Sequence, residues 1–205
     1  MNISHTLTLS KKGFSLIEML LVLGVLAVLL IAAFVIYPKV RDQSQARNEA
    51  TNILAIQTNV RNLYANKGGN YTGLGDGLGA SDNGISNQAR VFPPTMNGGD
   101  YSKEAKITSS WGANVVVWKR PQVTTPLGTI PANRSFGILY ANIPPGVCVN
   151  LLPALSGSFH SVTVGNLEAG QESTRIEMIL PNGQINVNAI GDACKENVGM
   201  LLTSM

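Results

Sequence analysis

The stretch Lys11-Lys12-Gly13-Phe14-Ser15-Leu16-Ile17-Glu18 leads directly into nineteen uncharged residues, 19–37, and decides the fold of this chain. An apolar helix of roughly 20 residues, rising about 1.5 Å per residue, is long enough to cross a bilayer. The exception in this segment is the carboxylate of Glu18. Charged groups in membrane segments cost about 2.5–3.5 kcal/mol at the centre, less near an end, and they usually have a function. Glu18 therefore needs a cation that its own helix does not supply.

The order Lys-Gly-Phe-Ser-Leu-Ile-Glu before a membrane-length apolar run resembles the class III signal peptide of type IV pilins and pseudopilins. The resemblance implies that a prepilin peptidase cuts after Gly13 and that the new N-terminal residue, Phe14, is methylated. It also implies that Glu18, five residues into the mature chain, guides the assembly of subunits. A secretory signal would instead have a shorter apolar region that ends in a small-x-small cleavage site.

With this resemblance the chain divides into four parts. Residues 1–13 are expected to be the leader peptide, 14–37 the transmembrane and filament-core helix, 38–67 the amphipathic half of that helix, and 68–205 the globular head. A head of about 140 residues is close to the commonest domain size. Loss of the two leader lysines lowers the formal net charge of +3 by two, so the sequence pI near 9.0 is no sign of nucleic-acid binding.

Beyond Pro38, apolar residues recur at spacings of three and four, which predicts an amphipathic helix that packs against a sheet. Pro38 removes one backbone donor and can kink the helix. The helix is expected to end near residues 66–69, where glycines supply a stop. The apolar stripe comprises Ala46, Ala50, Ile53, Leu54, Ile56, Val60, Leu63 and Tyr64, and the residues mostly between them are Gln43, Gln45, Arg47, Glu49, Gln57, Asn59 and Arg61.

The second half of the chain contains segments rich in β-branched or aromatic residues, which is typical of β-strands. A glycine-rich surface connector, 68–99, is expected to precede them, and residues 145–155 are expected to form a short helix. A helix followed by strands predicts an α+β fold, with the long helix packed on one face of a mainly antiparallel sheet. The strands are predicted at 113–119, 135–141, 161–164, 174–180 and 184–190, with a hairpin turn at Pro181-Asn182-Gly183, and residues 200–205 can add a final strand.

The two cysteines, Cys148 and Cys194, lack the spacing of a zinc or thiol redox motif. In the family that the leader resembles, a cysteine pair ties the C-terminal part of the head back to the sheet. A head outside the cytoplasm, as the leader implies, would oxidise these two residues to a disulfide. The alternative is a pair of separate buried thiols.

Catalytic motifs are absent from the sequence, which contains no Gly-x-Ser-x-Gly, no His-Glu-x-x-His and no paired acids with a positioned partner. No catalytic, cofactor or metal site is therefore expected. His160 is expected in a solvated loop, and Trp111 and Trp118 are expected in the core or in strand pairs.

The resemblance implies a structural subunit of a type IV pilus. Val35 stands where many type IVa pilins have a kinking proline, which favours the type IVb class of bundle-forming and thin conjugative pili. The alternatives are a minor pilin or a type II secretion pseudopilin, and a membrane-tethered enzyme or binding protein.

The resemblance also implies partners and a location. The expected partners are other copies of the chain in a helical filament, a prepilin peptidase and N-methyltransferase, and the inner-membrane assembly machinery, with no specific nucleic acid. The prepilin would lie in the inner membrane with its N-terminus cytoplasmic and its head periplasmic. It would then enter an extracellular pilus for adhesion, aggregation or conjugation.

Overall fold

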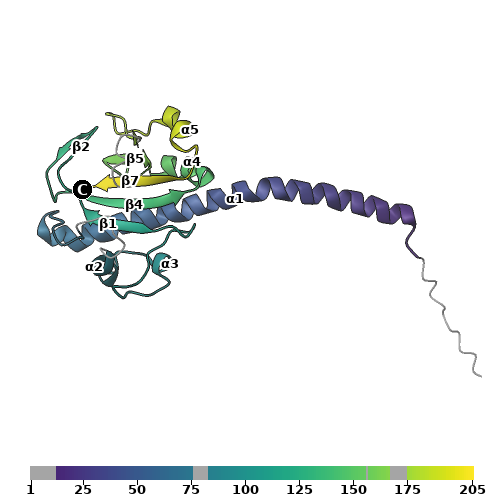
Figure 1. Ribbon diagram of the computed structural model, residues 1–205, viewed down its shortest axis with the longest axis horizontal. Coiled ribbons are helices and arrows are strands. Elements are labelled where there is room, and N and C mark those ends of the chain that lie inside the picture. The colour runs from purple at the N-terminus through teal and green to yellow at the C-terminus, as the bar shows by residue number, and fades with distance from the viewer. Residues whose placement is uncertain (1–12, 76–82, 156, 167–174) are drawn as a thin grey trace, which may run out of the picture. The chain divides into compact units, whose positions relative to one another are not determined.

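The computed structural model describes residues 13–75, 83–155, 157–166 and 175–205 (Figure 1). The chain forms two compact units, Met1–Val40 and Arg41–Met205. Helix α1 (Leu16–Tyr64) is 49 residues long and belongs to both units, and it continues through Pro38, although proline has no backbone N–H to donate. The long helix predicted from the sequence is therefore present, and it begins two residues after Phe14.

The end of α1 lies where the glycines predicted it. A short 3-10 helix, η1 (Ala65–Lys67), follows α1 and ends at Gly68, whose φ of 60° lies in the left-handed region. The N–H of Gly68 donates to the carbonyl of Ala65 at 3.2 Å. Glycine adopts this conformation without the steric cost that a side chain brings.

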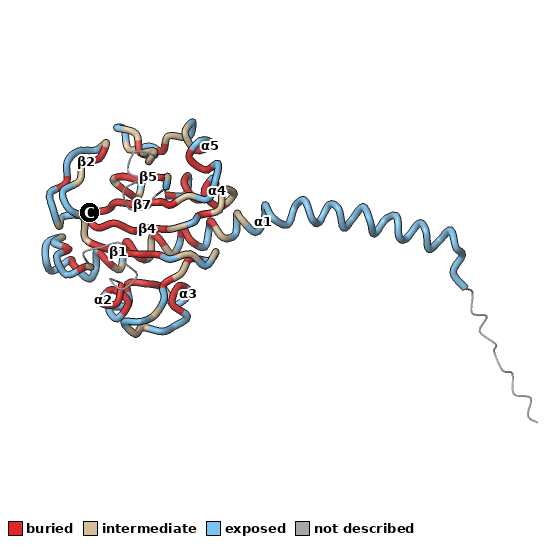
Figure 2. Tube along the Cα trace, in the orientation of Figure 1, coloured by how far each residue is buried: buried red, intermediate tan, exposed pale blue. Residues whose placement is uncertain are grey.

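One face of the second half of α1 is buried in the head (Figure 2). The apolar stripe predicted for this helix is buried, except at Leu63, which is 44% exposed, and at Leu54, which is only partly buried. Glu49 and Gln57, expected on the polar side, are buried because the head supplies them with hydrogen-bond partners. The buried residues of α1 are Ala46, Glu49, Ala50, Ile53, Ile56, Gln57, Val60 and Tyr64.

The head is built on a five-stranded sheet in the order β1-β4-β7-β5-β6, with every neighbouring pair antiparallel. The last strand in the sequence, β7, lies at the centre of this sheet. The fold is therefore α+β with an antiparallel sheet, as predicted. The strands are β1 (Val115–Lys119), β4 (Phe136–Ile143), β5 (Ser161–Gly165), β6 (Ile176–Glu177) and β7 (Val198–Ser204).

The register places the core residues of successive strands in rows. Val117 pairs with Ile138, Ile138 with Leu202, and Leu202 with Val162. These residues belong to the same buried cluster as Ile53 and Ile56 of α1. Alternate residues point to the other face of the sheet, as the strand period of two requires. That face carries a smaller cluster of Val116, Trp118 and Leu201 with Leu139 packed against it.

The predicted strand at 184–190 is wrong. Of the strand expected at 174–180, residue 174 lies outside the described part of the chain, and the described residues 175–180 contain only β6. The turn at residues 181–183 is confirmed, because Leu180 N–H donates to the Gln184 carbonyl at 2.8 Å. Beyond it, pairing is limited to a bridge between Ile179 and Ile185. Residues with low strand propensity, such as Asn188 and Gly191, then favour local turns. The segment instead forms η4 (Val187–Ala189) and α5 (Ile190–Ala193).

Short helices and strands account for the remaining differences between the structure and the elements predicted from the sequence. The connector expected over 68–99 contains α2 (Asn83–Gln88) and α3 (Pro94–Asn97), and its residues 76–82 lie outside the described part of the chain. A hairpin of β2 (Val123–Thr125) and β3 (Gly128–Ile130) was not predicted, because three-residue strands leave no measurable alternation. The short helix α4 (Pro145–Ala154) is confirmed.

Candidate assembly site

The first half of α1 presents an apolar surface that its own chain does not cover. From Leu16 to Val40 every residue is exposed, with Leu16 at 81% and Phe34 at 77% (Figure 2). By length and composition α1 is able to cross a membrane, and its most apolar window has a mean hydropathy of 3.2. A continuous apolar surface of this size marks a membrane or protein contact. Either lipid or other helices must therefore cover it.

Glu18 lies in the first turn of this exposed helix. Among the residues described, no cation lies within ion-pair distance of its carboxylate. The next cation along the helix is Lys39, which is about 32 Å away at 1.5 Å per residue. The helix dipole favours an acid in the first turn by about 0.3–1 kcal/mol, and in apolar surroundings a carboxyl group either binds a proton or pairs with an opposite charge. An opposite charge would have to come from outside the described residues.

Gly13 and Phe14 lie just before α1, and both are exposed. A Cβ built on Gly13 would meet no atom within 4 Å, and the same is true of Gly24 inside the helix. The fold therefore does not require glycine at position 13. If glycine is required at position 13, the requirement comes from another protein that recognises this residue.

The second half of α1 is fixed to the head by polar contacts as well as by its apolar face. The Glu49 carboxylate, 1% exposed, accepts hydrogen bonds from Ser110 N–H at 2.6 Å and from Asn52 Nδ2 at 3.3 Å. Burial raises the pKa of Tyr140 well above its ordinary value, and the charge and hydrogen bonding of Glu49 raise it further. Glu49 thus holds the loop before β1 against the helix.

Arg61 makes a second polar attachment, near the end of α1. Its Nε donates to the Met205 carbonyl at 2.6 Å, and its Nη2 donates to Ser204 Oγ at 3.0 Å. These contacts join α1 to the end of β7, the central strand of the sheet. Arg61 also lowers the pKa of His160, although burial is the larger cause of that shift. His160, expected in a solvated loop, is half-buried, and its backbone N–H donates to the Thr203 carbonyl at 2.9 Å.

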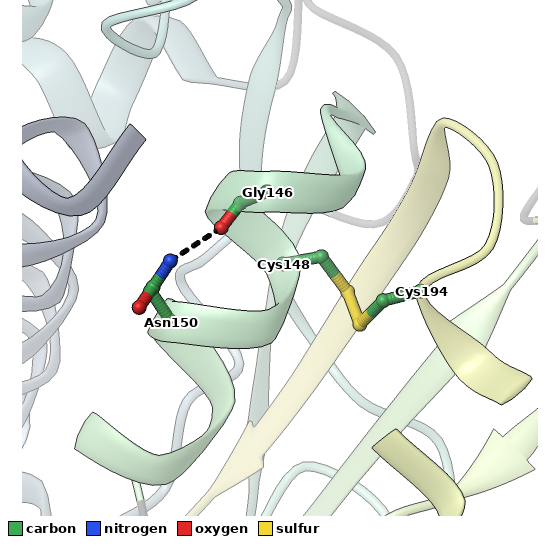
Figure 3. Close-up of a disulfide and its surroundings, with 4 residues drawn as sticks. All are labelled: Gly146, Cys148, Asn150 and Cys194. Carbon is green, nitrogen blue, oxygen red and sulfur yellow. Dashed lines mark hydrogen bonds between the residues drawn. A yellow bond between two sulfur atoms is a disulfide. The ribbon is translucent and has the colours of Figure 1, made fainter. Parts of the chain in front are cut away.

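Cys148 and Cys194 form a disulfide, which confirms the pairing that the resemblance implied (Figure 3). Cys148 lies in α4 and Cys194 directly follows α5, with their Cα atoms 5.7 Å apart. Both residues are buried, at 0% and 4% exposure. The bond ties the segment before β7 to the helix before β5. Closing a loop of this length contributes about 4 kcal/mol in the chain-entropy account.

Helix α4 also lies against α1. A Cβ built on Gly146 would clash with Oδ2 of Asp42, so only glycine fits this contact without a shift. In Figure 3 Gly146 lies in the first turn of α4, one turn before Asn150, whose Nδ2 donates to the Gly146 carbonyl at 2.7 Å. Because the same helix carries Cys148, the disulfide and α1 meet at α4.

The residues singled out from the sequence fall into two separate groups. Gly13, Phe14 and Glu18 lie together at the exposed start of α1, whereas the cysteine pair lies in the head. Trp118 packs on the outer face of the sheet, and Trp111 packs partly against the main core, as expected.

Sequence reasoning missed the polar anchors of α1. These are Glu49, Gln57 and Arg61, which follow one another at spacings of eight and four residues. That spacing places them on one face of the helix. Polar residues that keep the period of the apolar stripe were the signal that could have revealed them.

The sequence matches two known families. It matches the family described as PilS N terminal over residues 43–204, and the prokaryotic N-terminal methylation motif over residues 9–34. The first match covers most of the chain, and the second contains Gly13, Phe14 and Glu18. No curated protein sequence matches the chain.

Several solved structures resemble the chain. TcpA, a type IV pilin from Vibrio cholerae El Tor biotype, has a TM-score of 0.50 and 16% identity, covering 80% of this chain and 99% of that one. The crystal structure of a type IV b pilin from Salmonella typhi has a TM-score of 0.48 and 17% identity, covering 76% and 96%. The NMR structure of type IVb pilin PilS from Salmonella typhi has a TM-score of 0.39 and 16% identity, covering 78% and 95%. At such identities the likeness to TcpA concerns the fold.

Proposed function

Because this chain belongs to the PilS family of type IVb prepilins, we propose that it is cut between Gly13 and Phe14 and polymerises through the exposed half of α1. It is a structural subunit of a pilus and not an enzyme. The observation that carries the proposal is the apolar helix from Leu16 to Val40, which no other part of the described chain covers. The head, by contrast, has a complete core of its own.

Processing is supported by the accessibility of the proposed cleavage site. Gly13 and Phe14 are exposed and precede the helix, so an enzyme at the membrane surface can reach the bond between them. Cleavage removes Lys11 and Lys12, whose charges favour a cytoplasmic N-terminus only weakly, because Lys39 and Arg41 follow the apolar run. It also creates an amine on Phe14, which stays charged after a single methylation.

The new amine supplies the cation that Glu18 lacks. In one helix the two groups are four residues apart, or about 6 Å along the axis. A neighbouring subunit displaced by a short axial step can present its own amine to Glu18 instead. In low dielectric an opposite charge within about 4–6 Å strongly favours the ionised carboxylate. We infer that this pairing between subunits sets their stagger as the helices leave the lipid.

The location follows from the same helix. Before assembly the apolar half of α1 anchors the subunit in the inner membrane, with the head on the periplasmic side, where the disulfide can form. After assembly, neighbouring helices replace lipid around α1 in an extracellular filament. We propose that the chain is the major subunit of this pilus and that the pilus serves adhesion, aggregation or conjugation.

Mass spectrometry of the mature N-terminus tests the processing step. We expect wild-type chains to begin at methylated Phe14, and Gly13→Val to keep the full leader. Gly24→Val is the matched control, because a side chain at either glycine meets open space in the fold and only Gly13 adjoins the cut bond. A chain that starts at Met1, or that is cut after the apolar run, would overturn the proposal. Quantifying the protein in sheared fibres tests its place as the major subunit.

A further inference from the structure

Strand β1 is an outer strand of the head sheet, since only β4 pairs with it along its length. Its sequence, Val-Val-Val-Trp-Lys, combines β-branched and aromatic residues with a single charge and no proline. Such a strand with an open edge readily takes up an extended segment of another chain. We therefore asked which groups of the chain bond the backbone N–H and C=O groups on the free side of β1.

The side chain of Asn83 occupies the middle of this edge. Its Nδ2 donates to the Val115 carbonyl at 2.6 Å, and its Oδ1 accepts from Val117 N–H at 3.0 Å. One amide thus supplies the donor and the acceptor that a neighbouring strand would otherwise supply. Asn83 is only 2% exposed, so solvent does not compete for these bonds.

The flanking positions of the edge are also occupied. Val115 N–H donates to the Ile107 carbonyl at 3.1 Å, and Lys119 N–H donates to the Gly75 carbonyl at 3.1 Å. The N–H groups on the free side of β1 therefore have partners from three different segments of the chain. Only the central partner is a side chain, so a single substitution can remove it.

Helix α2 holds Asn83 in place. Asn87 lies four residues later on the same face, and its Nδ2 donates to the carbonyls of Asp100 at 3.0 Å and Ser102 at 2.8 Å. Its Oδ1 accepts from Asn97 Nδ2 at 2.8 Å. The two asparagine side chains of α2 are therefore both hydrogen-bonded, Asn83 with the strand and Asn87 with α3 and the loop after it. The Asn83 side chain is fixed before any partner arrives.

We propose that Asn83 closes the β1 edge against strand addition by a second copy of this chain. This inference goes beyond the proposed function; its hydrogen bonds lie in the head, and its choice of occupant rests on the proposed polymerisation. A second copy is the relevant occupant because a polymer holds many heads at high local concentration, and each would offer the same Val-rich edge. Self-pairing through β1 would compete with the helix contacts that build an ordered filament.

Hydrogen exchange on the full-length protein in detergent tests the local bonds. Asn83→Ala removes both bonds, and the nearly isosteric Asn83→Asp keeps the acceptor but places a carboxylate beside the Val115 carbonyl oxygen. We expect exchange of the Val117 amide to accelerate about three- to tenfold in Asn83→Ala, as the loss of a hydrogen bond predicts, and to stay near the wild-type rate in Asn83→Asp, which keeps the acceptor of that N–H. Amides of β4 and β7 should keep wild-type protection. Gln88→Ala, an exposed position on the same helix, is the control and should change nothing.

Light scattering on the same samples tests the consequence for association. We expect Asn83→Ala to form larger species than wild type and Gln88→Ala, and to bind a β-sheet-sensitive dye. Unchanged exchange at Val117 in Asn83→Ala, or association equal to that of wild type, would overturn the proposal. An equal loss of protection across β4 and β7 would also overturn it, because Asn83 would then support the whole fold and not the edge.

Discussion

Gln57 in α1 donates a 2.9 Å hydrogen bond from Nε2 to Oγ of Ser204, which is the last residue of β7 and 147 positions away in the sequence. The same nitrogen donates to the Ser158 carbonyl at 2.6 Å. Gln57 and Ser204 are both buried. The polar contact therefore fixes the position of the helix along the central strand, whereas apolar packing alone would permit sliding.

Replacing Gln57 tests this attachment. Gln57→Leu keeps the size of the side chain but leaves the Ser158 carbonyl without its donor, and we expect the free energy of unfolding of the head to fall by about 1–3 kcal/mol. Gln43→Leu, at an exposed position of the same helix, should change it by less than about 0.5 kcal/mol. Chemical denaturation of the detergent-solubilised protein, followed by tryptophan fluorescence, measures both. Equal stability of the two variants would contradict the role of Gln57.

The architecture of the head could be predicted from the sequence because its main signals are local. The three-to-four spacing from Ala46 to Tyr64 predicted the buried helix, and Gly68 predicted its end. The placement of β7 between β4 and β5 could not be predicted, since strand order depends on long-range pairing. The burial of Glu49 and Gln57 depends in the same way on partners 61 and 147 positions away.

Removal of the disulfide should weaken the head without affecting the leader. We expect Cys148→Ser with Cys194→Ser to lower the free energy of unfolding by about 4 kcal/mol, because the unfolded chain regains the freedom of the closed loop. Subunit levels in the cell should fall, while the fraction of chains cut after Gly13 stays at the wild-type value. Immunoblotting and denaturation of the purified protein check the two effects. Free thiols in the mature wild-type protein, detected by non-reducing peptide mapping, would contradict the account.

The contact between Gly146 and Asp42 predicts a compensating pair of substitutions. Gly146→Ala should destabilise the head by less than about 1 kcal/mol, because the new methyl group forces the Asp42 carboxylate to move but alanine is the better helix former. Adding Asp42→Ala should restore part of that loss, as residues in direct contact are coupled. Gly191→Ala is the control, since a Cβ there meets no atom within 4 Å. Strictly additive effects in the thermal melts would show that the two residues do not interact.

His160 predicts how stability depends on pH. Burial and the Arg61 charge lower the pKa of His160 below its ordinary value of 6.5. The unfolded chain therefore binds the proton more readily, so stability is full above about pH 6.5 and decreases as the pH falls through the folded-state pKa. His160→Gln should remove this dependence, because it is the only histidine beyond the leader. Denaturation between pH 7.5 and about 5 measures it, and the same slope in both proteins would contradict the prediction.

At the start of the chain, the resemblance to the class III signal peptide singled out Gly13, Phe14 and Glu18. The match to the methylation motif covers all three, and their individual roles stay predictions. The fold adds that Gly13 has no steric reason to be glycine. The strand expected at 184–190 is wrong because Ile185, Val187 and Ala189 alternate with polar residues as in a strand, while the neighbouring asparagines and glycine favour turns.

The central claim is that Glu18 directs assembly by pairing with the amine of Phe14 on another subunit, and Glu18→Ala tests it most directly. The variant should insert in the membrane and be cut after Gly13, as mass spectrometry of its N-terminus will show. Electron microscopy should find few or no surface filaments, with the same result for the isosteric Glu18→Gln. Glu196→Gln, an exposed acid of the head, should form filaments at wild-type numbers. Wild-type filament numbers from Glu18→Ala would contradict the mechanism.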